Sequence, residues 1–405
     1  METLDCHTLI VGAGLSGLAC ALTLERSGVD WLLIEKNPAV GGRVQTRKTD
    51  AGYLLDHGFQ VLNTAYPALH RLIDITELNL GEFESGAEVF LENRFQRVAD
   101  PLRKPGDLLA SLASQVGGTL DKLHILRLVW FCQNPGSADS VSSMTTEEFL
   151  CHFGFSKVIV DRFFRPFFGG VFLEEELLTS ARKFVTLFSY FSRGSAALPA
   201  GGMQALPELL ASKLPADRIK LGVAAEQCEA GAVHSETLSI RPRHLALAGW
   251  QSQHRLLKTA IPQTHSAYTL YFSRPKTDGR GKTYLKLNGS PHGGVQTVAF
   301  NSAVQPTYAP HDRDLIAVSA RRKTSEGQVR EELTSWFGDQ VLSWEHLHSD
   351  HIRQALPQEF NQLRRIEVRE FEGLQVHCLG DHTETGSIQG ALTSGRKAGL
   401  AIAGG

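Results

Sequence analysis

Close to its start the chain reads Thr8-Leu-Ile-Val-Gly-Ala-Gly-Leu-Ser-Gly17, a glycine-rich turn between an apolar run and a helical pattern. Each glycine has its own role: Gly12 allows a tight turn after a strand, Gly14 lets the backbone approach a pyrophosphate, and Gly17 lets the helix pack closely on the sheet. The N–H groups and the positive dipole end of that helix attract phosphate without requiring a lysine. The residues expected to contact a dinucleotide here are Gly12, Gly14, Leu15, Ser16 and Gly17.

The patterns around this turn favour a dinucleotide site over a chance motif. Residues 9–11 form an apolar strand pattern, and apolar residues recur at helical spacing over 15–22. A second apolar strand, over 31–34, ends at Glu35, about 20 residues after the glycines, where an acid binds the adenosine ribose hydroxyls. A glycine-rich turn in some other α/β protein is the alternative, and this context makes it the weaker one.

The segment after the second strand resembles that of one group of flavoproteins. Residues 35–43 read Glu-Lys-Asn-Pro-Ala-Val-Gly-Gly-Arg and are similar to a segment of the amine oxidase, protoporphyrinogen oxidase and phytoene desaturase superfamily. The resemblance implies FAD as the cofactor, with its pyrophosphate along paired glycines that let the main chain pass and an arginine that forms charge-assisted bonds. A surface turn with a solvated arginine is the alternative. The contacts implied are Glu35, Lys36, Gly41, Gly42 and Arg43.

A second motif lies near the C-terminus. Residues 379–391 read Leu-Gly-Asp-His-Thr-Glu-Thr-Gly-Ser-Ile-Gln-Gly-Ala and resemble the second FAD motif of the same superfamily. By resemblance, Gly380 and Asp381 lie at the ribityl hydroxyls, and a helix beginning near Ser387 and Ile388 aims N–H groups at the pyrimidine edge of the flavin. The positive end of a helix there favours acceptance of a hydride, because reduced flavin carries negative charge near N1 and O2.

The resemblance continues more loosely between the two motifs. Residues 55–60 read Leu-Asp-His-Gly-Phe-Gln and occupy the place of a turn near the isoalloxazine ring, which implies contacts from Gly58, Phe59 and Gln60. The acid of this segment, Asp56, could equally cap the end of a strand. A helix is expected from the Pro199–Pro207 segment to about Lys213, followed by a strand over 219–223, from which Val223 contacts adenine.

Departures from the amine oxidases bring the chain closer to the desaturase-like members. Amine oxidases carry a lysine near flavin N5, and a rough alignment of residues 266–272 places Ala267 or Tyr268 there. Lys286 is a candidate substitute, although a surface lysine on an alternating strand is the favoured interpretation. The tyrosine that amine oxidases carry beside the final helix is missing from residues 386–390. No catalytic side chain can be assigned from the sequence.

Composition narrows the class of protein. The chain has 405 residues, of which 42% are hydrophobic, and a formal net charge of −2, with basic and acidic residues mixed. This size predicts more than one core, and the charge gives no reason to expect nucleic acid. The six cysteines have no C-x-x-C spacing and indicate reduced thiols in a reducing compartment. His346, His348 and His351 invite a metal interpretation, but a polar face beside a helix start is favoured, so no metal is expected.

Membrane spans and targeting segments are not expected. The first strand begins within about ten residues of Met1, which leaves no room for a cleaved signal and favours a cytoplasmic location. No run of roughly 18 apolar residues is present. Residues 163–172 pack five phenylalanines into ten positions. Exposed, such a strip would bind a membrane or an apolar partner; a wall of the substrate cavity or ordinary core is favoured.

The predicted fold class is α/β: a Rossmann-type FAD-binding domain with an inserted α+β substrate domain. The FAD-binding domain is expected over 1–75, 201–250 and 371–405, a mainly helical substrate segment over 76–200, and a substrate sheet over 251–370. After a turn at 100–101, helices are predicted around 108–113, 123–131 and after the cap Thr145, with a surface loop at 134–140. Strands are predicted at 269–272, 284–287 and 315–319.

The expected activity is removal of a hydride from a C–H bond of an apolar or amphipathic small molecule by bound FAD. Gly279-Arg-Gly281 lacks the third glycine of a second dinucleotide motif, so electrons are expected to pass to oxygen or a quinone-like acceptor. A flavin amine oxidase and an FAD-dependent isomerase without net redox turnover are the alternatives. A nicotinamide-dependent dehydrogenase would purify colourless and would not need residues 41–43.

Overall fold

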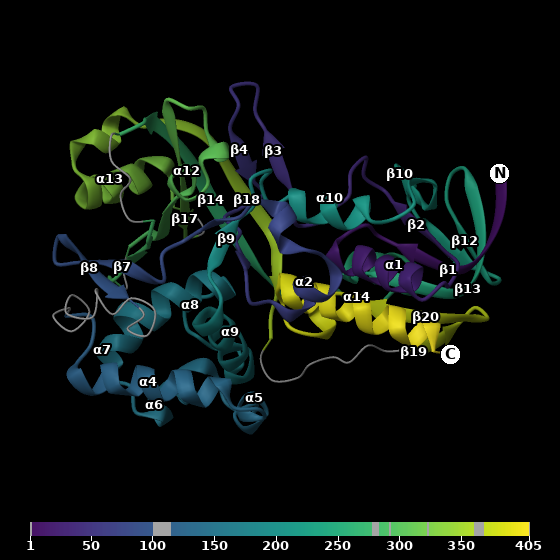
Figure 1. Cartoon of the computed structure of the whole chain (residues 1–405), viewed down its shortest axis with the longest axis horizontal. Helices are drawn as coiled ribbons and strands as arrows, with labels where there is room; N and C mark the ends of the chain where they lie inside the picture. Colours follow the sequence, from purple (N-terminus) through teal and green to yellow (C-terminus); the bar gives the residue numbers. More distant parts are fainter. Residues whose placement is uncertain are drawn as a thin grey trace.

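The computed structural model is elongated and contains two large sheets (Figure 1). The first sheet and both termini lie at one end, and the second sheet and most of the helices lie at the other. The structure describes residues 2–99, 115–277, 283–290, 293–321, 324–359 and 368–404. The predicted helix at 108–113, the turn at 100–101 and Gly279–Gly281 lie outside these residues.

The first sheet is built on parallel strands. Its order is β10-β2-β1-β13, after which β13 pairs with β20 along one part and with β12 along another. The edge strands are β10, β11 and β19. The bounds are β1 Glu2–Val11, β2 Trp31–Glu35, β10 Ile219–Leu221, β11 Gln227–Glu229, β12 Ala232–His234, β13 Leu238–Ala248, β19 Val368–Phe371 and β20 Leu374–Leu379. The strands predicted at 9–11, 31–34 and 219–223 are all present.

Two helices, α1 (Leu15–Arg26) and α14 (Ile388–Ala403), pack side by side on one face of this sheet. Ile10 and Leu33 point to that face, whereas Leu9 and Ile34 point to a separate core on the other, as strand alternation requires. A β-carbon at Gly395 would collide with the carbonyl oxygen of Ser16, so a small residue lets the helices approach closely. The first and last segments of the chain therefore form one unit.

The second sheet has the order β18-β14-β17-β16-β15-β7-β8 and is mostly antiparallel. Its strands are β7 Gly86–Leu91, β8 Arg94–Ala99, β14 Thr264–Pro275, β15 Leu285–Asn288, β16 Val295–Phe300, β17 Arg313–Ala320 and β18 Glu345–Pro357. Helix α13 (Glu326–Phe337) covers one face through Val329, Leu333 and Trp336. The three predicted strands are present, and β7 and β8 add strands to the segment expected to be mainly helical.

The helical part lies below this sheet in Figure 1. It contains α4 Thr119–Gln133, α5 Ser137–Ser140, α6 Thr146–Phe153, α7 Lys157–Ile159, a π-helical turn Val160–Phe164, α8 Arg165–Phe172 and α9 Ala181–Arg193. The capping box predicted at the start of α6 is present, because Thr145 Oγ1 accepts from Glu148 N and Glu148 Oε2 accepts from Thr145 N. Phe164, Phe168 and Phe172 are buried, so the phenylalanine-rich segment is core and cavity wall, as favoured from the sequence.

Short elements connect these parts. The remaining strands are β3 Thr46–Lys48, β4 Leu54–Asp56, β5 Leu62–Asn63, β6 Gly81–Glu82 and β9 Ala196–Leu198. The remaining α-helices are α2 Pro67–Leu72, α10 Ala205–Ser212, α11 Trp250–Leu257 and α12 Asn301–Val304, and the 3-10 turns are Ile75–Leu78, Ala216–Arg218, Pro306–Tyr308, Asp339–Ser343 and Asp381–Thr383. Within the described residues, none of the helices combines the length and apolarity needed to cross a membrane.

Two local predictions were wrong. The surface loop expected at 134–140 is partly helical, because α5 occupies its second half. Residues 346–351 lie within β18 rather than beside a helix start, because β14 pairs with this segment along its length. The helix expected from the Pro199–Pro207 segment to about Lys213 is present as α10, which begins within that segment and ends at Ser212. The proposed domain boundaries stay predictions; strands of the first sheet fall within the three segments assigned to FAD binding, apart from the start of β19.

Candidate functional site

A cavity of about 810 Å³ lies where the two sheets and the helical part meet. It is lined by all but one of the residues that the sequence assigned to the cofactor: Gly12, Gly14, Leu15, Ser16, Glu35, Lys36, Gly41, Gly42, Arg43, Gly58, Phe59, Gln60, Val223, Gly380, Asp381, Ser387 and Ile388. The exception is Gly17, which lies beneath the turn, where a β-carbon would collide with the carbonyl oxygen of Gly12. Its role is therefore in packing the helix against the turn, and the others face one space.

The glycine turn leaves room for a ligand beside the start of α1. Gly12 has a φ of +106°, and a β-carbon there would lie 2.9 Å from the carbonyl oxygen of Ala248. Gly14 has an ordinary φ of −72°, and the nearest atom to a β-carbon there would be Gly42 Cα at 4.0 Å. Neither backbone strain nor packing therefore requires glycine at this position. A side chain at Gly14 would instead extend into space beside the first N–H groups of α1, which fits a bound pyrophosphate.

Glu35 is held rigidly at the end of β2. Its Oε2 atom accepts a hydrogen bond from Ala13 N at 2.8 Å, and its Oε1 atom accepts from both Asn37 N and Asn37 Nδ2. The carboxylate is buried yet lines the cavity. Val223 N donates to the Glu35 carbonyl oxygen at 2.8 Å, which fixes the neighbouring wall. The sequence did not indicate that Asn37 orients this acid.

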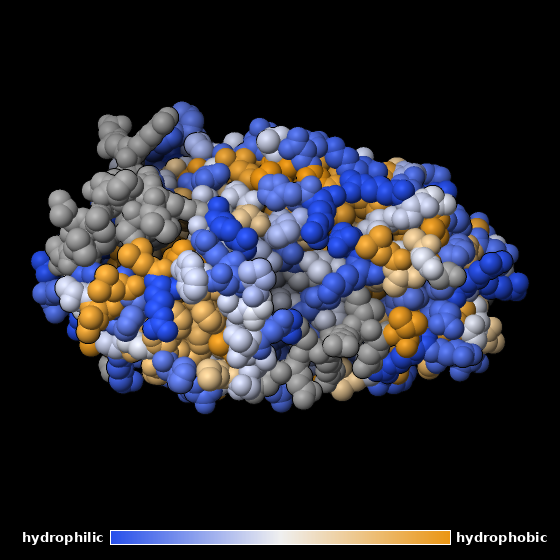
Figure 2. All heavy atoms as spheres, turned by 60° about the horizontal axis from the view of Figure 1, so that its bottom comes forward, coloured by the Kyte–Doolittle hydropathy of each residue, from blue (hydrophilic) through white to orange (hydrophobic). Residues whose placement is uncertain are grey.

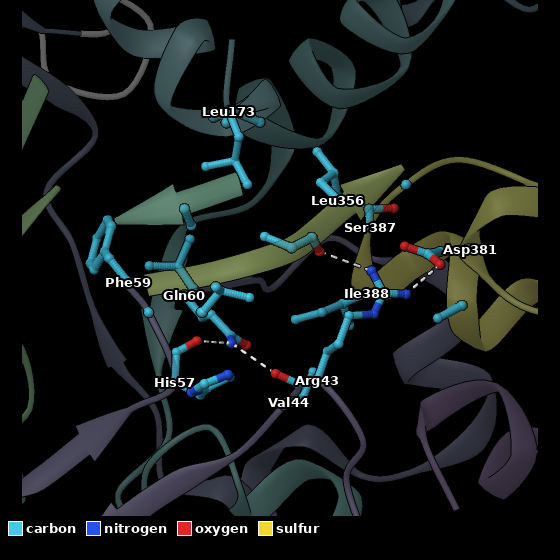
Figure 3. Close-up of a pocket in the computed structure, with 18 of the residues that line it drawn as sticks. Arg43, Val44, His57, Phe59, Gln60, Leu173, Leu356, Asp381, Ser387 and Ile388 are labelled. Atoms are coloured by element: carbon cyan, nitrogen blue, oxygen red, sulfur yellow. Dashed lines mark hydrogen bonds and ion pairs between the residues drawn. The ribbon is translucent and has the colours of Figure 1, made fainter. Parts of the chain in front are cut away.

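Arg43 joins the two sequence motifs. Its Nη2 atom lies 2.5 Å from Asp381 Oδ1, and its Nη1 atom donates to the Ala355 carbonyl oxygen at 2.9 Å (Figure 3). Its guanidinium also lies 4.3 Å from the centre of the Trp250 ring. The arginine predicted for the pyrophosphate and the acid predicted for the ribityl chain thus lie in contact, although they are far apart in the sequence.

The turn that contains Gly58, Phe59 and Gln60 is fixed from several sides. Gln60 Nε2 donates to the carbonyl oxygens of Arg43 and His57 (Figure 3), and Phe59 N donates to Thr269 Oγ1. The turn therefore links the arginine segment to β14 of the second sheet.

Asp56 lies behind this turn rather than in the cavity wall. Its carboxylate accepts hydrogen bonds from Met203 N, Thr46 Oγ1 and Tyr308 Oη. Burial raises the pKa of Asp56 to about 6, although these hydrogen bonds oppose that shift. The sequence left two roles open for Asp56, a place in the turn near the isoalloxazine ring and a cap at the end of a strand. These contacts match the strand-end role.

A buried charge pair lies beside the start of α14. Ser387 Oγ caps this helix by accepting from Gly390 N, and the N–H groups ahead of Gly390 have no acceptor within the helix. Glu359 accepts a hydrogen bond from Gly386 N, and Lys183 Nζ of α9 lies 3.0 Å from Glu359 Oε1. The lysine side chain is fully buried.

This pair was not predicted from the sequence. Glu359 and Lys183 lie in distant segments with no shared motif, so no local signal marked them. Two further ionisable groups lie close to the lysine. Burial is the main cause that lowers the pKa of His265, and the nearby charge of Lys183 lowers it further. Burial raises the pKa of Glu174, and Lys183 opposes that increase.

Beyond the flavin motifs, phenylalanines form part of the cavity lining. Phenylalanines from α8, α9 and the turn before them form one wall: Phe163, Phe164, Phe167, Phe168, Phe188 and Phe191. The sheet contributes Thr269, Thr297 and Ser319 opposite. The lining thus combines the polar dinucleotide motifs with a phenylalanine wall, and Glu175, Gln296 and Arg321 also line the cavity.

Lys286 is not a substitute for the amine oxidase lysine. Its Nζ atom pairs with Glu88 Oε2 at 2.7 Å and lies over the Phe95 ring, away from the cavity lining. The favoured alternative, a surface lysine, was also wrong, because the side chain is mostly buried. Ala267 and Tyr268 do line the cavity, as the alignment implied. Among the described residues of the lining, the one lysine is Lys36.

Histidines and cysteines are the residues that could bind a metal or act as nucleophiles. His346 Nε2 contacts Ser349 Oγ and His348 Nε2 contacts Asp350 Oδ1, and the described residues contain no cluster of three or more metal-ligating side chains. All six cysteines are free thiols. Burial raises the pKa of Cys20 and Cys132 to about 12, which keeps these thiols protonated and unreactive.

Comparison with known proteins shows the family of the chain. The profile of the family described as flavin containing amine oxidoreductase matches residues 15–230, which is more than half of the chain. The chain belongs to this family. The flavoprotein is accordingly an FAD-dependent oxidoreductase with an α/β fold, as the resemblance predicted.

Curated relatives match over shorter stretches. The flavoprotein is 29% identical to protoporphyrinogen oxidase 2 of Arabidopsis thaliana over 164 residues, which are 40% of the chain and 31% of that protein. It is 46% identical to phytoene desaturase of Neurospora crassa over 54 residues, 13% of the chain and 9% of that protein. The flavoprotein thus spans less than a third of the length of these relatives.

Solved structures share the whole architecture. Putrescine oxidase bound to putrescine aligns with a TM-score of 0.71 over 99% of both chains, at 18% sequence identity. This likeness extends the fold to the parts of the chain that the family profile does not match.

Proposed function

We propose that the flavoprotein dehydrogenates an apolar or amphipathic small molecule, which loses one hydrogen as a hydride and one as a proton. The observation that carries this proposal is the phenylalanine wall of the cavity opposite the β14–β17 part of the sheet. Bound FAD would supply the hydride acceptor, and oxygen or a quinone-like molecule would then take up the electrons.

The chain contributes binding, orientation and exclusion of water. Glu35, the start of α1 and Arg43 would hold the adenosine and pyrophosphate, and Asp381 the ribityl chain. The start of α14 would place N–H groups at the pyrimidine edge. The phenylalanines would exclude water and align a C–H bond, since a dry, fixed geometry is what hydride transfer requires of a protein.

An anaerobic substrate screen tests the proposal. Apolar and amphipathic alkenes, porphyrinogens and amines would each be mixed with the purified protein, and the visible flavin band followed. A dehydrogenase substrate bleaches the band until oxygen or a quinone is added. Turnover without lasting bleaching would favour an isomerase, and bleaching by amines alone would favour an amine oxidase; either result contradicts the proposal.

We also propose that the protein acts in the cytoplasm. Its six free thiols support this location, because secreted proteins usually pair their cysteines. Fractionation of the producing cell, with the protein followed by its mass, tests the location.

A further inference from the structure

Helix α4 exposes a stripe of large apolar side chains. Leu120 is 69% exposed, Leu123 60%, Leu126 41% and Trp130 69%. These residues are spaced three or four apart, so they lie on one side of the helix. A surface helix normally presents charged and polar residues to water, so this stripe is unusual for a free surface.

The opposite side of the same helix belongs to the cavity. Ile125 and Val129 line the cavity next to the phenylalanine wall. At 100° per residue, Leu126 lies about 60° around the helix from Val129. Apolar surface therefore continues around α4 from the cavity wall to the exposed stripe, and the helix is the partition between them.

The exposed side of α4 carries a basic residue and no acid. The solvent-facing residues of α4 are Thr119, Leu120, Leu123, Leu126, Arg127, Trp130 and Gln133, a set that contains no acid. Asp121 is turned inward, where its carboxylate accepts hydrogen bonds from Gly118 N, Ser156 N and Ser156 Oγ. Lys157 at the start of α7 is exposed beside the exposed Val158, and its Nζ atom lies 3.3 Å from Asp161 Oδ2.

We propose that α4 docks the flavoprotein on the surface of an anionic lipid bilayer, with its apolar stripe in the interface. Leucines with a tryptophan on one side and basic residues alongside are the features by which interfacial helices bind such lipids. Figure 2 turns the lower side of the molecule forward and shows hydrophobic side chains gathered at its left, the end at which Figure 1 places α4. Docking in this way presents the cavity partition to the lipid.

Tryptophan fluorescence gives a direct readout. Trp130 is exposed, whereas Trp31, Trp250, Trp336 and Trp344 are buried. Mixing the holoprotein with vesicles of phosphatidylcholine and phosphatidylserine should shift emission to the blue, and the protein should sediment with them. Trp130→Phe should bind these vesicles while losing most of the spectral shift, which would place Trp130 in the interface. Phosphatidylcholine alone and high salt should weaken binding, because screening removes the basic contribution.

A matched pair of variants tests the stripe. Leu120→Glu combined with Leu123→Glu should weaken vesicle binding at least about tenfold, since it removes two apolar contacts and adds two repelled charges. Leu342→Glu is the control, because Leu342 is also 69% exposed but lies in the Asp339–Ser343 turn. Unchanged flavin absorption and melting temperature show that each variant is folded.

Three outcomes would overturn the proposal. The unmodified protein could fail to sediment with the anionic vesicles. The double variant could bind as tightly as the unmodified protein or as Leu342→Glu. The protein could instead form dimers without lipid that the double variant abolishes, which would make the stripe an interface between copies of this chain.

Discussion

At the scale of single residues, Glu35 connects the glycine turn to the adenosine site. It is buried, and both carboxylate oxygens accept backbone N–H groups from Ala13 and Asn37. Replacing Glu35 with Ala should weaken FAD binding by about 2–4 kcal/mol, because two hydrogen bonds from ribose hydroxyls to a charged group are lost. Titration of the apoprotein with FAD, followed by flavin fluorescence, measures the change.

Asn37→Ala provides the matched control for that titration. This change removes one side-chain bond to Glu35 but leaves the carboxylate and its bond from Ala13 N in place. It should weaken FAD binding by about 1 kcal/mol or less. Equal FAD affinity in the Glu35→Ala variant and the unmodified protein would mean that this acid does not hold the ribose.

The pair of Lys183 and Glu359 is the second test at this scale. Glu359→Gln should lower the free energy of unfolding by about 3–5 kcal/mol, because it leaves a buried ammonium without the carboxylate that contacts it. The glutamine oxygen can still accept from Gly386 N, so the effect reports the charge rather than the hydrogen bond. Urea unfolding of the holoprotein measures it.

Two further variants identify the cause. Lys183→Met combined with Glu359→Gln should recover most of the lost stability, because removing both charges removes the penalty. Glu384→Gln, which breaks an exposed pair with Lys397, should change stability by about 1 kcal/mol or less. A double variant no more stable than Glu359→Gln would argue against a charge effect.

At the scale of elements, the sequence predicted what local spacing controls. The unit β1–α1–β2 follows from glycine positions and apolar periodicity, and the start of α14 from resemblance to a known motif, all within short windows. The histidine-containing segment 346–351 was misassigned because its strand state comes from pairing with β14, which is distant in the sequence. The prediction that Lys286 is a surface lysine was wrong for a similar reason. Its partner, Glu88 of β7, is distant in the sequence.

The first turn of α14 offers a test of its proposed electrostatic role. Ser387→Asp should lower the flavin reduction potential, because it adds negative charge where reduced flavin holds its own. The free energy of reducing the flavin should become less favourable by on the order of 1–3 kcal/mol in a partly dry site. Aspartate also caps helices well, so α14 should form as before. Redox titration of the holoprotein against reference dyes measures the potential.

Ser387→Asn separates charge from size. Asparagine matches aspartate in shape and also caps helices, yet carries no charge. Its flavin potential should stay near that of the unmodified protein. If Ser387→Asp gives a potential equal to or above that of Ser387→Asn, the helix does not point at the flavin.

At the scale of the whole molecule, the site exists only where distant segments meet. The contact between Arg43 and Asp381 brings together the N-terminal and C-terminal motifs, and β14 with α8 and α9 completes the cavity. The sequence identified the residues of the two motifs because each has a local signature. It could not identify Glu359, Lys183 or Asn37, whose roles depend on contacts across the fold or on the direction of one side chain.

Two buried groups give the molecule opposing responses to acid. Burial lowers the pKa of His377 to about 4, so its contribution to stability is present above its unfolded pKa, near 6.5, and is lost as pH falls toward 4. Burial raises the pKa of Asp56 to about 6. A carboxyl group with a raised pKa contributes stability that is fully present below its unfolded pKa, near 3.9, and is lost as pH rises through 6. The two effects oppose one another between about pH 4 and 6.

Removing the Asp56 carboxyl should therefore expose the opposite response. Asp56→Asn can keep its contacts, because the amide oxygen accepts from Met203 N and Thr46 Oγ1 and the amide nitrogen can donate to Tyr308 Oη. Relative to this variant, the unmodified protein should gain about 2 kcal/mol of stability as pH falls from 7 to 4, since the pKa difference limits the change and the unfolded carboxyl is itself about half protonated at pH 4. Urea midpoints at several pH values measure the gain, and Asp50→Asn, at an exposed position, should show no such pH-dependent difference from the unmodified protein. A stability difference between Asp56→Asn and the unmodified protein that stays constant across this range would mean that Asp56 remains ionised in the folded state, held so by its three hydrogen-bond donors.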